Sequence, residues 1–164
     1  MSFSWLARST TAARAAVMSL LLVACTALGC HAPPARIHAE PPEGFARYSP
    51  ETGMRAVSPD GVVYRVRVEP NQPRADLAFW RAALRHHMAD VGYRIIGDGP
   101  IEDGKLPGYW LEMAAPYGEQ DHSYLMAIFV QGDSILIAEG AGEVSRFEKH
   151  RGALMHAIRT VEKR

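Results

Sequence analysis

The sequence predicts an α+β domain in which two amphipathic helices pack on a mainly antiparallel sheet. Three observations lead to this class. Apolar and polar residues alternate in several short segments, of which residues 62–68 are the clearest. Two longer segments repeat their apolar residues every three or four positions, as helices do. The segments follow one another as two strands, a helix, a short strand, three strands and a helix, an order typical of α+β folds.

The first two strands are expected to form a hairpin. They cover residues 53–57 and 62–68, and residues 58–61 between them read Ser-Pro-Asp-Gly. Proline presets φ in a turn and glycine tolerates a positive φ, so this tetrapeptide suits a tight turn. Alternation along the second strand places Arg65 and Arg67 on the face opposite its apolar side chains. One face of the hairpin should therefore meet solvent.

A helix is predicted to follow the hairpin. Asp76 can cap it, because a carboxylate there accepts amide protons of the first turn, and Gly92 suits its C-terminal end. Residues 93–96 are expected to form a short strand, and the glycines and proline within residues 97–104 predict a loop. The apolar stripe of the helix consists of Trp80, Leu84, Met88 and Val91.

Three strands and a closing helix complete the predicted domain. The strands cover residues 109–114, 123–130 and 135–138, and Gly132-Asp133 suits a hairpin turn between the last two. Ser145 and Glu148 fit a capping box at the start of the helix. Gly140 and Gly142, just before it, are expected to let the chain bend from strand to helix. The apolar stripe of this helix consists of Phe147, Leu154, Ile158 and Val161.

The N-terminal residues have the features of a secretory signal. Arg8 and Arg14 precede an uncharged apolar stretch, residues 15–24. A transmembrane helix needs about 20 apolar residues, more than this stretch supplies even when it is extended to Cys30. We therefore predict a signal peptide over residues 1–24.

Leu22-Val23-Ala24-Cys25 resembles the bacterial lipobox. The resemblance implies cleavage before Cys25, a thioether-linked diacylglycerol on its sulfur, and acylation of the new N-terminus. Cys30, which follows Ala27-Leu28-Gly29, is the alternative site. Several acyl chains hold a protein firmly at a membrane, so we expect a lipid-anchored protein of the bacterial cell envelope. Because Thr26 rather than Asp follows Cys25, we favour the periplasmic side of the outer membrane.

Residues 25–52 are predicted to be the lipidated cysteine and a tether, followed by a single domain over residues 53–164. The tether contains five prolines between residues 33 and 50 and few apolar side chains, which favours an extended spacer. The alternative is that it docks in part on the domain through Phe45 and Tyr48.

The order of elements in residues 53–164 resembles the PsbP-like fold, an αβα-sandwich. The resemblance depends on the hairpin that runs from Tyr124 to Glu139 and on the helix that follows it, with Phe147, Leu154 and Ile158. It implies a binding or assembly factor of the kind that includes bacterial lipoproteins and extrinsic photosystem subunits. No catalytic residues are transferred by the resemblance.

Charge and cysteine content argue against nucleic-acid binding, an internal disulfide and a cysteine metal site. The chain has 18 basic and 18 acidic residues, and without Arg8 and Arg14 of the leader the balance is 16 to 18, or −2. Nucleic-acid binding requires clustered positive charge, so we expect no nucleic-acid partner. Both cysteines, Cys25 and Cys30, precede the domain, which therefore has neither an internal disulfide nor a cysteine metal site.

Two polar clusters are candidates for metal or catalytic sites. His86 and His87 are neighbours, and neighbouring side chains on a helix diverge by about 100°. Residues 119–122 contain Asp121 and His122 but follow a turn, which predicts a solvated loop. We therefore predict no catalytic residues, no metal and no cofactor. The alternative is an envelope metal-dependent enzyme that uses His86, Asp121 or His122.

Aromatic residues of the strand at 109–114 are the predicted contact residues, because aromatic side chains concentrate at interface hot spots. Alternation leaves Trp110 and Tyr109 on opposite faces, and Trp110 is the preferred contact residue. Arg151 falls near the apolar stripe of the closing helix, where we expect it to pair with Glu112. We predict a non-catalytic binding or assembly module with an envelope protein partner. A carrier with an apolar ligand between helix and sheet is a further alternative.

Overall fold

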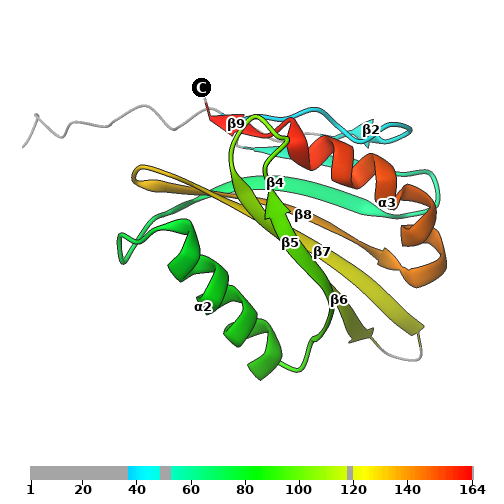
Figure 1. Ribbon diagram of the computed structural model, residues 1–164. Coiled ribbons are helices and arrows are strands. Elements are labelled where there is room, and N and C mark those ends of the chain that lie inside the picture. The colour runs from blue at the N-terminus through cyan, green and yellow to red at the C-terminus, as the bar shows by residue number, and fades with distance from the viewer. Residues whose placement is uncertain (1–36, 49–52, 118–119, 164) are drawn as a thin grey trace, which may run out of the picture. The chain divides into compact units, whose positions relative to one another are not determined.

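Seven strands form one antiparallel sheet in the order β2-β3-β4-β8-β7-β6-β5 (Figure 1). The structure is a computed structural model that describes residues 37–48, 53–117 and 120–163. The predicted signal peptide, Cys25 and Cys30 lie outside these residues. The strands are β2 (Ala46–Arg47), β3 (Met54–Val57), β4 (Val63–Pro70), β5 (Arg94–Ile101), β6 (Gly108–Tyr117), β7 (Gln120–Gln131) and β8 (Ser134–Glu143).

Two helices cover opposite faces of the sheet and are offset from each other (Figure 1). α2 (Leu77–Asp90) packs against β5, β6 and β7, whereas α3 (Val144–Arg159) packs against β7 and β8. We call these the α2 face and the α3 face. The arrangement confirms the predicted α+β class, with two helices on a mainly antiparallel sheet. On the α3 face, β5 and β6 lie beyond the strands that α3 mainly contacts.

Alternation along the strands divides the core between the two faces. The α3 face contributes the larger cluster, in which Tyr64, Leu125, Phe129 and Leu136 meet Phe147, Leu154 and Ile158 of α3. The α2 face contributes a smaller cluster, formed by Tyr109, Leu111, Met113, Met126, Ile128, Ile135 and Met88. Met88 is the one buried residue of α2, so most of the apolar stripe of this helix, including Trp80 and Leu84, is only partly covered.

Both predicted hairpins are confirmed. β3 pairs with β4, and Gly61 in the turn between them has a φ of +90°. β7 pairs with β8 through a turn in which Gly132 has a φ of +61°. A positive φ costs glycine little because it lacks Cβ, which is why these two positions could be identified from the sequence. Asp76 caps α2 as expected, since its carboxylate accepts from the Phe79 amide at 2.9 Å.

The start of α3 differs from the prediction in two ways. The N-cap is Glu143 and not the predicted Ser145. The Glu143 carboxylate accepts hydrogen bonds from the amides of Ser145 and Arg146. Gly140 and Gly142 do not form a bend but continue β8, because they admit side chains that pack onto the strand. A Cβ at Gly140 would lie 3.1 Å from Leu154, and one at Gly142 would lie 2.9 Å from Val62.

The predicted loop at residues 97–100 is also wrong, because β5 runs without interruption through Gly97, Gly99 and Pro100. The strand contains a bulge between Ile95 and Gly97. Glycine and proline are tolerated here because β5 is an edge strand, where one row of backbone groups has no neighbour to bond.

Part of the predicted tether packs with the domain. β1 (Ile37–His38) pairs with β9 (Glu162–Lys163) beyond the C-terminal end of α3, and β2 pairs with β3. Phe45 is buried and its ring meets the His150 ring edge-on at 5.2 Å, whereas Tyr48 remains 46% exposed. The docking considered for this segment therefore occurs at Phe45, and the packed unit includes residues that precede position 53. None of the helices in the described part of the chain is long and apolar enough to cross a membrane.

Candidate functional site

The outer edge of β5 is the candidate functional site, because β5 is the last strand of the sheet in the described part of the chain and both predicted contact residues lie on its one neighbour, β6. Tyr109 and Trp110 are consecutive residues of β6, paired with Pro100 and Gly99 of β5. Consecutive side chains of a strand point to opposite faces. Trp110 therefore lies on the α3 face and Tyr109 on the α2 face. We call this strand and the side chains that contact it the β5 edge.

On the α3 face, the Trp110 ring lies against the two glycines of β5. A Cβ at Gly97 would lie 3.3 Å from two ring carbons, and a Cβ at Gly99 would lie 3.0 Å from the indole Nε1. Larger residues at these positions would push the ring away from the strand. Trp110 is partly buried, so part of the residue remains exposed to solvent.

A charged pair borders the Trp110 ring. The Arg151 guanidinium from α3 lies 5.8 Å from the ring centre, within range for a cation–π contact. Its Nη2 lies 2.8 Å from the Glu112 carboxylate, as predicted from the sequence. The hydrogen bond from Arg151 to Glu112 raises the pKa of the arginine. Glu112 is 4% exposed, so its buried carboxylate holds the Arg151 guanidinium in place. The Arg151 side chain itself remains 38% exposed.

On the α2 face, Tyr109 is 5% exposed and acts through its hydroxyl group. The hydroxyl donates to the Asp98 carboxylate and accepts from Arg85 Nη1 at 3.2 Å. Arg85 Nη1 also lies 2.7 Å from Asp98. The hydrogen bonds from Tyr109 and Arg85 lower the pKa of Asp98. Burial, followed by the Asp98 contact, raises the pKa of Tyr109. Asp98 is therefore held as a carboxylate that orients Arg85.

These groups line a surface hollow of about 430 Å³ between α2 and β5, formed by Arg81, Arg85, Asp98, Gly99, Pro100 and Tyr109. Arg81 lies with its guanidinium 5.4 Å from the centre of the Tyr109 ring. Arg81, Arg85 and Asp98 are not among the predicted site residues, because residues 97–104 are expected from their glycines and proline to form a loop. The Gly-x-Gly spacing opposite an aromatic residue could have indicated an edge strand at this position.

The β5 backbone is protected against pairing with another strand. A bulge follows Ile95, Pro100 lacks an amide proton, and Arg94 and Asp98 place charge on the strand. Natural proteins use these features to prevent edge-to-edge association. Contacts at the β5 edge are therefore expected to involve side chains.

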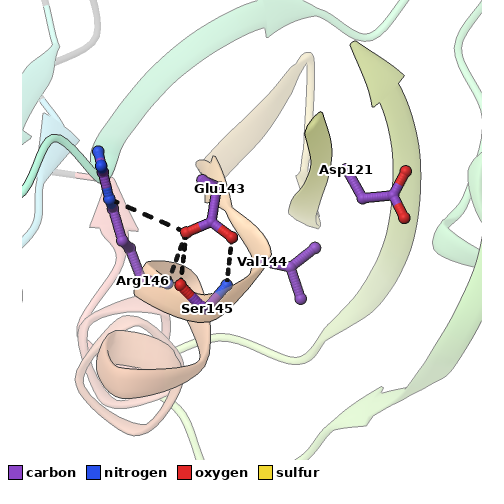
Figure 2. Close-up of a pocket in the computed structure, with 5 residues that line it drawn as sticks. All are labelled: Asp121, Glu143, Val144, Ser145 and Arg146. Atoms are coloured by element: carbon purple, nitrogen blue, oxygen red, sulfur yellow. Dashed lines mark hydrogen bonds and ion pairs between the residues drawn. The ribbon is translucent and has the colours of Figure 1, made fainter. Parts of the chain in front are cut away.

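The candidate metal ligands do not converge. His86 is exposed on α2 and pairs with Asp90 at 3.3 Å. Asp121, at the start of β7, instead lines a hollow at the N-terminal end of α3 with Glu143, Ser145 and Arg146 (Figure 2). The Glu143 carboxylate already accepts the hydrogen bonds that cap α3. Among the residues that the structure describes, no three His, Cys, Asp or Glu side chains form a group that could hold a metal ion.

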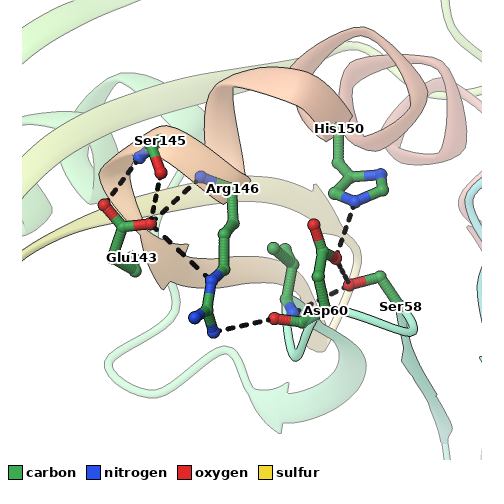
Figure 3. A network of polar contacts seen from close by, with 7 residues as sticks. Ser58, Asp60, Glu143, Ser145, Arg146 and His150 are labelled. Atoms are coloured by element: carbon green, nitrogen blue, oxygen red, sulfur yellow. Dashed lines mark hydrogen bonds and ion pairs between the residues drawn. The ribbon is translucent and has the colours of Figure 1, made fainter.

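A second polar network, Ser58, Asp60 and His150, joins the β3–β4 turn to α3 (Figure 3). The Ser58 hydroxyl donates to Asp60 at 2.6 Å and accepts from the Val62 amide at 2.8 Å. His150 Nε2 lies 2.9 Å from Asp60. The serine hydrogen bond, then the histidine, lower the pKa of Asp60. Asp60 bonds to both Ser58 and His150, so the network fastens the turn to the helix.

Comparison with known proteins gives structural relatives alone. No protein-family model and no curated protein sequence matches the chain. LpqN, described as involved in cell envelope biogenesis of Mycobacterium tuberculosis, is 13% identical with a TM-score of 0.59 over 80% of this chain and 87% of that one. PA94 of Pseudomonas aeruginosa, a protein of unknown function and putative regulator, is 12% identical with a TM-score of 0.57 over 73% and 97%.

A third solved structure supports the predicted fold. The cyanobacterial PsbP protein (CyanoP) of Synechocystis sp. PCC 6803 is 10% identical with a TM-score of 0.50, over 82% of this chain and 95% of that one. The chain has a PsbP-like fold. At these identities the likeness shows the PsbP-like architecture and transfers no activity, and it confirms the resemblance that the order of elements predicted.

Proposed function

We propose that this chain is a lipid-anchored, non-catalytic binding module of the bacterial cell envelope, which holds an envelope protein through the β5 edge. The lipid is attached to Cys25, with Cys30 as the alternative. The lipobox resemblance supports the anchor. LpqN, which shares the fold, is described as involved in cell envelope biogenesis, and this agrees with an envelope role.

The observation that supports binding at the β5 edge is the packing of the Trp110 ring against Gly97 and Gly99. Its ring is held by the glycines below and by Arg151 beside it, so little side-chain entropy remains to be lost when a partner covers it. Tryptophan and arginine are the residue types enriched among interface hot spots. Tyr109 contributes from the opposite face by fixing Asp98 and Arg85.

Site-specific crosslinking in living cells tests this proposal. A photoreactive amino acid replaces Ile96, which is 47% exposed on β5, and a matched control replaces Val63, which is 41% exposed on β4. A partner at the β5 edge should form an adduct with the probe at position 96 and not with the probe at position 63.

Trp110→Ala should lower the yield of that adduct about thirtyfold or more, the size expected for losing a hot-spot aromatic residue. Trp110→Phe should retain most of the yield, and a melting curve of each variant checks that the fold survives. Equal adducts from both probe positions, or an adduct insensitive to Trp110→Ala in a folded variant, would show that the partner site lies elsewhere.

A further inference from the structure

The hollow on the α2 face has an excess of positive charge. Arg81 and Arg85 contribute two positive charges and Asp98 one negative charge, so the net charge is +1. Asp98 is already paired with Arg85 at 2.7 Å. Among the described residues, Arg81 forms no ion pair with a carboxylate; its guanidinium lies over the Tyr109 ring, and its charge acts on Asp98 only at longer range. The hollow therefore has one positive charge that no ion pair compensates. Arg81 carries that charge and is the group available to bind an anion.

The surroundings of Arg81 suit an oxyanion. A guanidinium presents its donors in a rigid planar fork that matches phosphate and carboxylate oxygens. Arg85, fixed by Tyr109 and Asp98, supplies a second guanidinium on the same helix one turn later. Gly99 and Pro100 form the β5 side of the hollow without a long side chain, which leaves room for the substituents of an ester.

The loop that follows the β5 side of the hollow and the segment that follows β1 both contact the C-terminal end of α3. The loop after β5 contacts the C-terminal end of α3, because Lys105 donates to the Arg159 carbonyl at 2.9 Å and Asp103 pairs with Arg159 at 2.8 Å. The next residue, Thr160, accepts from the Glu40 amide at 3.0 Å, just after β1. Ile37 of β1 is 12 residues after Cys25, which corresponds to at most about 40 Å of extended chain.

We propose that this hollow binds a singly charged phosphodiester, and that its source is the headgroup of a lipid in the membrane that holds the anchor. The choice of source rests on the proposed lipid anchor, because a reach of about 40 Å keeps the domain near the bilayer surface. Binding would place the α2 face of the β5 edge toward the membrane and leave Trp110, on the α3 face, for the protein partner.

Nuclear magnetic resonance of the full chain in neutral detergent micelles tests the proposal. The amide signal of Gly99 reports on the hollow during titration with two probes, dimethyl phosphate as the free phosphodiester and phosphatidylglycerol in mixed micelles. Both probes should shift this signal to saturation, with phosphatidylglycerol effective at the lower concentration. Arg81→Ala should weaken both titrations about tenfold or more, because it removes a charge-assisted hydrogen bond.

The matched control is Arg74→Ala, an exposed arginine just before α2 that does not line the hollow, and it should leave both titrations unchanged. Absence of any saturable Gly99 shift with either probe, or equal weakening by both substitutions, would overturn the proposal. A response to dimethyl phosphate alone would retain the site and refute the lipid source. Both probes are added externally, so these outcomes do not depend on whether Cys25 is acylated.

Discussion

Phe147→Ala should lower the free energy of unfolding by about 3–5 kcal/mol, the range measured when buried phenylalanines are truncated. Phe147 is completely buried near the start of α3, where its ring belongs to the larger core cluster. Its removal takes apolar surface out of the core and leaves a cavity that the rigid sheet cannot close. Because that cost is a large fraction of the stability of a small domain, much of the variant should be unfolded at physiological temperature.

The matched control is the same substitution on the other helix. Phe79 of α2 is 50% exposed and its ring meets the Trp80 ring edge-on, so Phe79→Ala should lower the free energy of unfolding by at most about 1.5 kcal/mol. Urea unfolding followed by tryptophan fluorescence measures both. Similar losses for the two variants would contradict the placement of the main core between α3 and the sheet.

Glu139→Ala should lower the free energy of unfolding by about 2–3 kcal/mol, because it leaves charged and polar partners unpaired. Glu139 is 6% exposed on the α2 face of β8. Its carboxylate accepts from Arg65 Nε at 2.7 Å, from the Tyr124 hydroxyl at 2.7 Å and from Arg67 Nε at 3.3 Å. The estimate lies below the range for a fully buried pair because both arginines can regain water.

The same carboxylate should make stability depend on pH. Burial would raise the pKa of Glu139, but the hydrogen bonds from Tyr124, Arg67 and Arg65 outweigh it and hold the pKa below its ordinary value of 4.5. A depressed pKa in the folded state contributes stability that is complete above the unfolded-state value and is lost as pH falls through the folded-state value. The difference between the wild-type chain and Glu139→Ala should therefore be largest near neutral pH and shrink below pH 4.5.

Glu69 provides the control for this experiment. It pairs with Arg67 on the same strand, but its side chain is 48% exposed. An exposed ion pair stabilises little, so Glu69→Ala should change the free energy of unfolding by at most about 1 kcal/mol. Urea titrations at pH 7 and pH 3.5 measure both variants. A Glu139→Ala penalty that is small or independent of pH would show that the buried network does not stabilise the fold.

Periodicity was sufficient to predict the fold wherever one face of an element meets the core. The alternation of β4 and the stripe of α3 are examples, because burial selects apolar residues at fixed intervals. It failed at β5, where Gly97, Gly99 and Pro100 are signals for loops in most contexts. An edge strand tolerates them, and glycine at positions 97 and 99 lets the Trp110 ring lie close against the strand. That fit involves a neighbouring strand, so it could be found only by considering the pairing of β5 with β6.

Periodicity also made part of the candidate site predictable. The sequence identified Tyr109, Trp110 and the Arg151–Glu112 pair, because strand alternation and a helix stripe place them on known faces. Arg81 and Arg85 could not be related to Asp98 and Tyr109, because their meeting depends on how α2 lies across β5 and β6. Likewise, the role of Glu143 as the α3 cap depends on where β8 ends.

Mass spectrometry of the N-terminal peptide, from chain purified from a bacterium that processes lipoproteins, tests the central claim most directly. The mature protein should begin at Cys25 and contain a diacylglycerol thioether and an N-linked acyl chain. Cys25→Ala should abolish the modification, whereas Cys30→Ala should leave it intact. If the peptide begins at Met1 without lipid, the chain is not a lipoprotein and the proposed envelope function is wrong.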